Sequence, residues 1–183
     1  MTPVMNSPDR YGVVAIFLHW VMAAMIIGLF FLGEYMVDLN YTHRWYNGAP
    51  HLHESVGLLL FALLIFRTVW TAANPRPLPL PMPAWERFAA ATVKKLFYLL
   101  LFGITISGYL IPTADGKGIE LFNWFTVPAT VAHLDHQEDI AGSVHHVLVD
   151  STVILVILHA LAALKHHFLD KDATLMRMIG KAK

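Results

Sequence analysis

Four histidines lie inside or at the ends of long apolar runs: His19, His53, His145 and His159. A histidine within a membrane helix is costly to desolvate, so it marks a functional site by default. Neutral imidazole is also the side chain with which proteins most often bind metal ions. The four residues therefore indicate metal ligation inside a membrane, and the helices that carry them decide which can meet.

The composition is that of a membrane protein. The chain has 183 residues, of which 56% are hydrophobic and only 14% charged, and this is too apolar for an ordinary soluble domain. The chain contains no cysteine. Covalent c-type haem attachment, thiolate-bound iron–sulfur clusters and disulfides are therefore excluded.

Four apolar runs are long enough to span a bilayer. They cover about residues 13–33, 53–70, 91–111 and 141–168, and a membrane helix needs roughly 20 residues at ~1.5 Å rise each. The sequence thus predicts an all-α fold, a four-helix membrane bundle formed by a single integral membrane domain over residues 1–183.

Charge sets the expected orientation of the bundle. Only two of the 13 Lys and Arg residues, Arg44 and Lys117, fall in the segments 34–52 and 112–140. The other 11 fall near the termini and the proline-rich loop of residues 74–83. Because cationic loops stay in the cytoplasm, both termini are expected there, in a multi-pass protein of a bacterial inner membrane.

This topology sorts the four histidines by depth. His53 and His145 fall near the periplasmic ends of their helices, whereas His19 lies near the cytoplasmic end of the first. His159 follows His145 by 14 residues, about 21 Å deeper along the helix. The sequence therefore predicts two pairs, His53 with His145 at the outer level and His19 with His159 at the inner level.

The helical period gives a second criterion. At about 100° per residue, a spacing of 14 leaves a drift of roughly 40°, so His145 and His159 share one helix face. This favours His145 over the adjacent His146, although the neighbouring histidines leave the choice open.

Arg67 follows His53 by 14 residues and reaches the inner level. It could pair with an acidic group of an inner cofactor or extend to lipid phosphates.

Two histidines per level fit haem iron better than zinc. Paired axial histidines suit one-electron transfer, whereas zinc requires three or four protein ligands around one ion. Two haems at different depths would connect the two sides of the membrane. The alternatives are histidines that merely lie at the interface and a metal transporter in which Asp150 joins a relay.

The chain resembles the bacterial cytochrome b561 family, four-helix di-haem membrane cytochromes that include a superoxide oxidase. The likeness rests on FLHW at 17–20, LHESVG at 52–57, GYLIPTADG at 108–116 and VH at 144–145. Its most specific part is HALAALKHHFLDKDATLMR at 159–177. The resemblance implies that His19, His53, His145 and His159 bind the iron of two haem b groups.

The resemblance also implies ubiquinone or ubiquinol as a redox partner, and superoxide as a possible substrate. His166 and His167 follow His159 at the inner end of the last helix and could bond a quinone carbonyl. The alternative is a basic stop at the membrane surface. Superoxide is less favoured, because an anion is attracted by a positive surface and segment 112–140 carries five carboxylates against Lys117.

The leading hypothesis is therefore transmembrane electron transfer between the periplasmic side and membrane ubiquinone, with superoxide:ubiquinone oxidoreduction as one version. The alternative is a membrane anchor and electron conduit for a periplasmic redox or binding protein. The sequence also predicts that segment 119–127 is a short amphipathic stretch at the membrane interface.

Overall fold

Four long helices form the body of the molecule. In the computed structural model, which describes residues 3–181, they are α1 (Val13–Val37), α2 (Gly48–Ala73), α3 (Ala84–Leu110) and α4 (Gln137–Phe168). All four are long and apolar enough to cross a membrane. The predicted four-helix membrane bundle is therefore confirmed.

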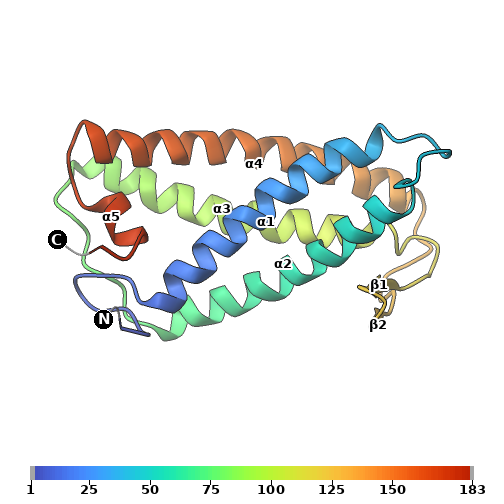
Figure 1. Ribbon diagram of the computed structural model, residues 1–183, viewed down its shortest axis with the longest axis horizontal. Coiled ribbons are helices and arrows are strands. Elements are labelled where there is room, and N and C mark those ends of the chain that lie inside the picture. Colours follow the sequence, from blue (N-terminus) through green and yellow to red (C-terminus); the bar gives the residue numbers. More distant parts are fainter. Residues whose placement is uncertain (1–2, 182–183) are drawn as a thin grey trace.

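The helices run alternately up and down, so that both ends of the described chain lie at one end of the bundle (Figure 1). We call this the basic end, because most lysines and arginines lie near it in the sequence. The opposite end carries the α1–α2 loop and a small β-hairpin, and we call it the hairpin end.

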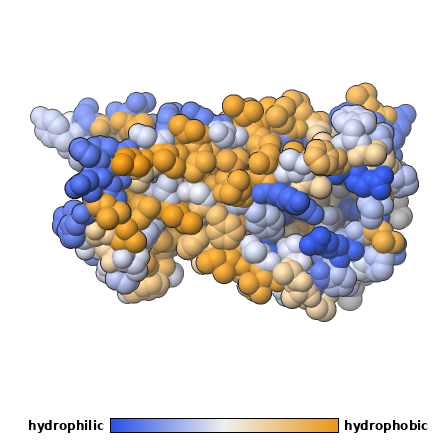
Figure 2. Space-filling model, turned by 180° about the vertical axis from the view of Figure 1, so that it is seen from behind, coloured by the Kyte–Doolittle hydropathy of each residue, from blue (hydrophilic) through white to orange (hydrophobic). Residues whose placement is uncertain are grey.

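Apolar side chains cover the outside of the bundle. Phe31, Leu99 and Val147 are each more than 60% exposed, and hydrophobic residues gather over the middle of the face in Figure 2, between more polar ends. In water such a surface would be unstable, but in lipid it is the expected exterior. The backbone polar groups are satisfied within each helix, as a membrane requires.

Few residues are fully buried between the helices. Met22, Leu60, Leu64 and Leu101 form a core cluster from α1, α2 and α3. Close packing joins α1 to α2, α2 to α3, and α3 to α4. Because lipid tails are as apolar as these side chains, van der Waals packing rather than water exclusion stabilises such contacts.

A β-hairpin lies beside α2 at the hairpin end. Strands β1 (Ile119–Leu121) and β2 (Phe125–Val127) pair antiparallel around a tight turn. Phe122 and Asn123, at the start of this turn, both have positive φ. The amphipathic stretch expected here is therefore a hairpin, with Trp124 78% exposed near its tip.

One hydroxyl group attaches this hairpin to the bundle. Ser55 in α2 is fully buried, and its Oγ donates to the carbonyl oxygen of Glu120 at 3.2 Å. The same Oγ accepts a hydrogen bond from the amide of Phe122 at 3.0 Å. Ser55 lies two residues after His53. The hairpin therefore contacts α2 close in sequence to a candidate ligand.

The C-terminal segment folds back against the basic end. Short helix α5 (Thr174–Met178) lies there (Figure 1), and the Trp20 indole Nε1 donates to the carbonyl oxygen of Met178 at 2.7 Å. Arg177 Nη1 donates to the carbonyl oxygen of Leu78 at 2.8 Å. The tail is thus connected to α1 and to the proline-rich loop.

The helices extend beyond the apolar runs from which they were predicted. Helix α3 begins at Ala84 rather than near residue 91, directly after Pro83 and with Glu86 in its first turn. Proline before a helix and an acidic residue in the first turn are both start signals. Hydropathy alone misses this polar first turn because it finds only the lipid-embedded part.

Replacing Ser55 by alanine is expected to loosen the hairpin without unfolding the helices. The change removes the hydrogen bonds to Glu120 and Phe122, both on the β1 side of the turn, and leaves a part-buried amide unpaired, which costs about 1–3 kcal/mol. Hydrogen exchange at the Phe122 amide should accelerate. Ser151→Ala is the control, because Ser151 is partly exposed and bonds only within its own helix; equal protection of the Phe122 amide in both variants would contradict this role for Ser55.

Candidate functional site

The structure brings His53 and His145 together at the hairpin end. Their ring centroids lie 6.4 Å apart. His145 Nδ1 is 3.0 Å from the carbonyl oxygen of Ile104 in α3. A carbonyl only accepts, so Nδ1 carries the hydrogen and Nε2 remains available as a ligand atom.

His146 points elsewhere. Its side chain is 73% exposed, and Nε2 lies 3.7 Å from Asp150 one turn along the same helix. The helical argument that favoured His145 over its neighbour therefore agrees with the positions of both rings. Asp150 itself is exposed on this outer face, away from the paired histidines.

His19 and His159 meet at the other level, with ring centroids 6.2 Å apart. The ring of Phe97 from α3 packs edge-on against His159 with centroids 5.4 Å apart. Trp20 packs edge-on against His19 from the adjacent position. Aromatic neighbours of this kind limit the rotation of both imidazoles while supplying no competing ligand atom.

Each histidine pair spans two helices that do not pack closely on one another. His19 and His159 join α1 to α4, whereas His53 and His145 join α2 to α4. Within the described chain, the close helix contacts are instead those of consecutive helices. The histidines of each pair thus face each other from helices that make few other contacts with one another.

Glycines keep space free one turn away from the outer pair. Gly57 follows His53 by four residues and Gly142 precedes His145 by three, which puts each on the face of its neighbouring histidine. A Cβ added at either glycine would meet nothing within 4 Å. At Gly108, by contrast, an added Cβ would lie 3.0 Å from Cε1 of His145, so this glycine permits the ring to approach α3.

Arg67 points into the bundle rather than toward its end. Its Nη1 lies 3.9 Å from the sulfur of Met22, and the side chain is half-buried. Met22 is one turn from His19 on α1. The guanidinium is therefore at the inner level, as its spacing from His53 predicted, and methionine sulfur is a weak acceptor that leaves its other donors available.

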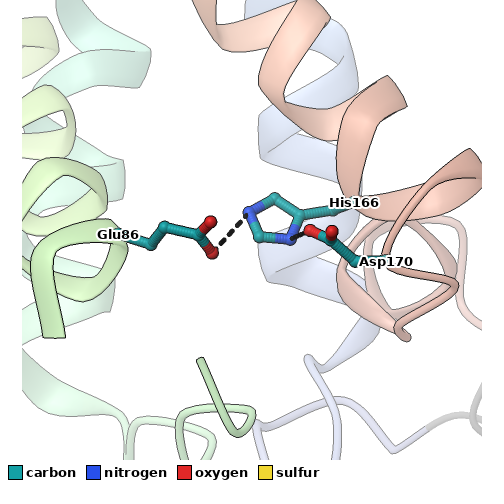
Figure 3. Close-up of side chains that lie close together, drawn as sticks. All are labelled: Glu86, His166 and Asp170. Atoms are coloured by element: carbon teal, nitrogen blue, oxygen red, sulfur yellow. Dashed lines mark ion pairs between the residues drawn. The ribbon is translucent and has the colours of Figure 1, made fainter. Parts of the chain in front are cut away.

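The two remaining candidate residues lie at the basic end in different surroundings. His166 is surrounded by carboxylates from α3 and from the segment after α4, two of which appear with it in Figure 3. His167 instead lines a pocket of about 260 Å³ together with Lys171, Asp172 and Met176. The structure therefore separates two adjacent histidines that the sequence left equivalent.

Sequence reasoning missed several groups that position the site. The carbonyl of Ile104 and the hydroxyl of Ser107, 3.3 Å from His145 Nδ1, both come from α3. Glu86 also contacts Lys165 and His166. The start signal around Pro83 could have revealed Glu86, but no local pattern marks a carbonyl that accepts from a histidine 41 positions later.

Comparisons with known proteins agree with this architecture. Residues 10–181 match the model of the prokaryotic cytochrome b561 family. The chain belongs to that family. It is 50% identical over 178 residues to cytochrome b561 homolog 2 of Escherichia coli (strain K12), covering 97% of this chain and 95% of the relative. It is 28% identical over 177 residues to a probable superoxide oxidase CybB of Yersinia pestis, covering 95% and 98% respectively.

Membership of the cytochrome b561 family makes this a multi-pass inner-membrane protein of electron transport and implies that it binds haem b. The residues present fit that group. Two imidazole nitrogens that bind one metal ion from opposite sides at about 2 Å each put their ring centroids roughly 6 Å apart. The separations of 6.2 and 6.4 Å match this spacing at both levels.

A leucine at Gly57 is expected to lower haem content, because its side chain would enter the free space beside His53. Gly28→Leu is the matched control: its added Cβ also meets nothing within 4 Å, but Gly28 lies on an exposed stripe of α1 with Ile27 and Phe31. The measurement is haem per chain in purified protein. Equal haem content in the two variants would show that the space beside His53 does not receive the porphyrin.

Proposed function

We propose that this cytochrome b561 holds two haem b groups, one between His53 and His145 and one between His19 and His159. The observation that carries the proposal is the pair of imidazole separations at two levels of one bundle. Bis-histidine haem supplies one-electron transfer with little rearrangement. The chain's own contribution is to fix both ring pairs and to exclude water from the space between the helices.

The side chains around the rings define their roles. Ile104 and Ser107 orient His145, and Phe97 holds the ring of His159. Arg67 supplies a positive charge beside the inner level, where it can pair with a haem propionate. The proposed site therefore consists of four iron ligands and a small set of residues that set their orientation.

We infer the orientation from charge. The basic end carries most of the cations and both termini, so it is assigned to the cytoplasm by the positive-inside rule. The hairpin end is then periplasmic. In this orientation electrons pass between a periplasmic partner at the His53–His145 level and a membrane partner at the His19–His159 level.

Ubiquinone is the proposed partner at the basic end. The pocket lined by His167, Lys171, Asp172 and Met176 combines an apolar side chain with hydrogen-bond donors, which suits a ring that carries two carbonyl oxygens. His167 follows His159 by eight residues, about 12 Å along α4. We therefore assign quinone contact to His167 and give His166 a separate role.

The periplasmic partner is an electron donor, and superoxide is the candidate that the name of the Yersinia pestis relative supplies. The surface here offers little attraction for an anion. Lys117 is paired with Asp115, whose carboxyl pKa is lowered mainly by the hydrogen bond from that lysine. A periplasmic redox protein is the other donor consistent with these charges.

Removal of His145 is expected to eliminate one of two haems, whereas removal of His146 should eliminate none. His145→Ala deletes a proposed axial ligand, and His146→Ala deletes an exposed ring bound only to Asp150. Reduced-minus-oxidised spectra with haem and iron per chain provide the measurement. Two haems in the wild type and one in His145→Ala are expected, and an unchanged His145→Ala spectrum would refute the outer pairing.

Ubiquinone is expected to reoxidise the chemically reduced protein. Detergent-purified protein, reduced under anaerobic conditions, is mixed with a short-chain ubiquinone, and the α-band is followed by stopped flow. Persistence of the reduced band, while ferricyanide still reoxidises it, would reject quinone as the partner.

Superoxide is tested separately by generating it enzymatically beside oxidised protein and excess quinone. Loss of superoxide faster than in buffer would identify it as the donor. No acceleration would leave a periplasmic redox protein, which co-purification at low salt could then reveal.

A further inference from the structure

His166 lies within a ring of carboxylates at the basic end. Its side chain is only 16% exposed, and Nδ1 lies 2.8 Å from Asp172 Oδ2 and 3.0 Å from Asp170 Oδ2. On the opposite side of the ring, Nε2 faces Glu86 Oε2 at 4.0 Å. Figure 3 shows the imidazole held between Glu86 from α3 and Asp170 from the segment after α4.

Glu86, His166 and Asp170 each offer one possible metal-ligating atom, and these atoms lie within 4.8 Å of one another. Protein groups already partner the ring, however, since Nδ1 lies within hydrogen-bond distance of two carboxylates. A cation is also already present, because Lys165 Nζ lies 2.7 Å from both Glu86 and Asp170. An imidazole between carboxylates is instead an arrangement in which a proton can be accepted from one group and given to another.

The cluster adjoins the proposed quinone pocket through one residue. Asp172 bonds His166 and also lines the pocket with His167, Lys171 and Met176. Burial raises the pKa of Asp172, but hydrogen bonds from Thr174 and His166 outweigh this effect, and the net pKa is lowered. Its carboxylate is therefore ionised near neutral pH, ready to accept a proton that it passes onward.

We propose that His166 carries protons from the cytoplasmic surface to the quinone pocket, with Asp170 as the entry and Asp172 as the exit. This inference rests on the proposed reduction of ubiquinone at the basic end. Asp170 is the most exposed of the three carboxylates around His166, with 32% of its side chain accessible, against 20% for Asp172 and 11% for Glu86. Proton entry is therefore assigned to Asp170.

Each proton moves from Asp170 through the His166 ring to Asp172. A protonated Asp170 loses its O–H bond as N–H forms at Nδ1, and this N–H then breaks as O–H forms on Asp172. Asp172 releases that proton to a quinone oxygen and becomes a carboxylate again. Complete reduction takes two electrons, delivered singly by the proposed electron transfer from the periplasmic donor, and two such protons; the donor is oxidised and the quinone becomes quinol.

Charged groups from α3, α4 and the C-terminal segment surround His166. The groups that face or adjoin it are Glu86 from α3, Lys165 and His167 from α4, and Asp170, Lys171 and Asp172 from the C-terminal segment. Lys165 offsets part of the negative charge of the surrounding carboxylates. The Glu86 oxygen lies near Nε2, whereas the two aspartates lie at Nδ1.

The test uses His166→Gln, which retains a hydrogen-bonding side chain but does not accept and release protons near neutral pH. The matched control is His146→Gln, an exposed histidine of the same helix outside the proposed machinery. Quinone-driven reoxidation of the reduced protein is measured across pH 5–9, in water and in deuterium oxide. We expect His166→Gln to slow this step about tenfold or more and to change its pH profile and solvent isotope effect, while the control matches the wild type.

Ferricyanide, a one-electron acceptor that takes no proton, separates the possible failures. Equal ferricyanide rates in wild type and His166→Gln, combined with a selective loss toward quinone, would support the relay. An unchanged quinone rate and isotope effect in His166→Gln would overturn it. A wild type that reduces ferricyanide but not quinone would instead refute the proposed function.

A second variant covers the case in which His166→Gln fails to hold its haems. Asp172→Asn keeps one acceptor oxygen, which can still accept from the Thr174 amide, and puts an NH2 group in place of the Oδ2 beside His166. It has no carboxylate to protonate. The relay predicts the same selective slowing toward quinone in this variant. A quinone rate and isotope effect equal to those of the wild type would overturn it independently of His166.

Discussion

Four imidazoles must meet in two pairs inside an environment that penalises each of them. A desolvated histidine is costly unless its nitrogens find partners, and here each pair joins helices that otherwise pack on different neighbours. Helix α4 contributes to both pairs. The bundle is therefore organised around the proposed ligands of α4, with α3 as the support along its length.

This constraint explains why α3 matters for the proposed site although it carries none of the four histidines. It provides the carbonyl that orients His145, the aromatic ring that packs on His159, and a glycine at the point where the His145 ring comes closest. Each contact is short-range and specific in direction. A helix of equal hydropathy without these features would fill the same place in the membrane but would leave the imidazoles free to rotate.

The sequence predicted those features of the fold and the site that depend on the residue spacing and charge of a single helix. The spacing of 14 between His145 and His159 predicted a shared face, and the depth order predicted which rings would meet. Groups brought together from distant segments could not be predicted: Lys165 and Glu86 are 79 positions apart, and Ser55 bonds a turn 67 residues later. The hairpin was missed for the same reason, because its position depends on a buried serine in another element.

The hydrogen bond from His145 to Ile104 also has a thermodynamic meaning. A histidine whose far nitrogen donates to a carbonyl is a more basic ligand, and a more basic axial ligand favours the oxidised metal. The inner level instead has the positive charge of Arg67 nearby, which favours the reduced state. With the two proposed haems in place, these contacts would make the reduction potential higher at the inner level. An electron arriving at the hairpin end would then move downhill toward the basic end, so the molecule would have a direction before any partner binds.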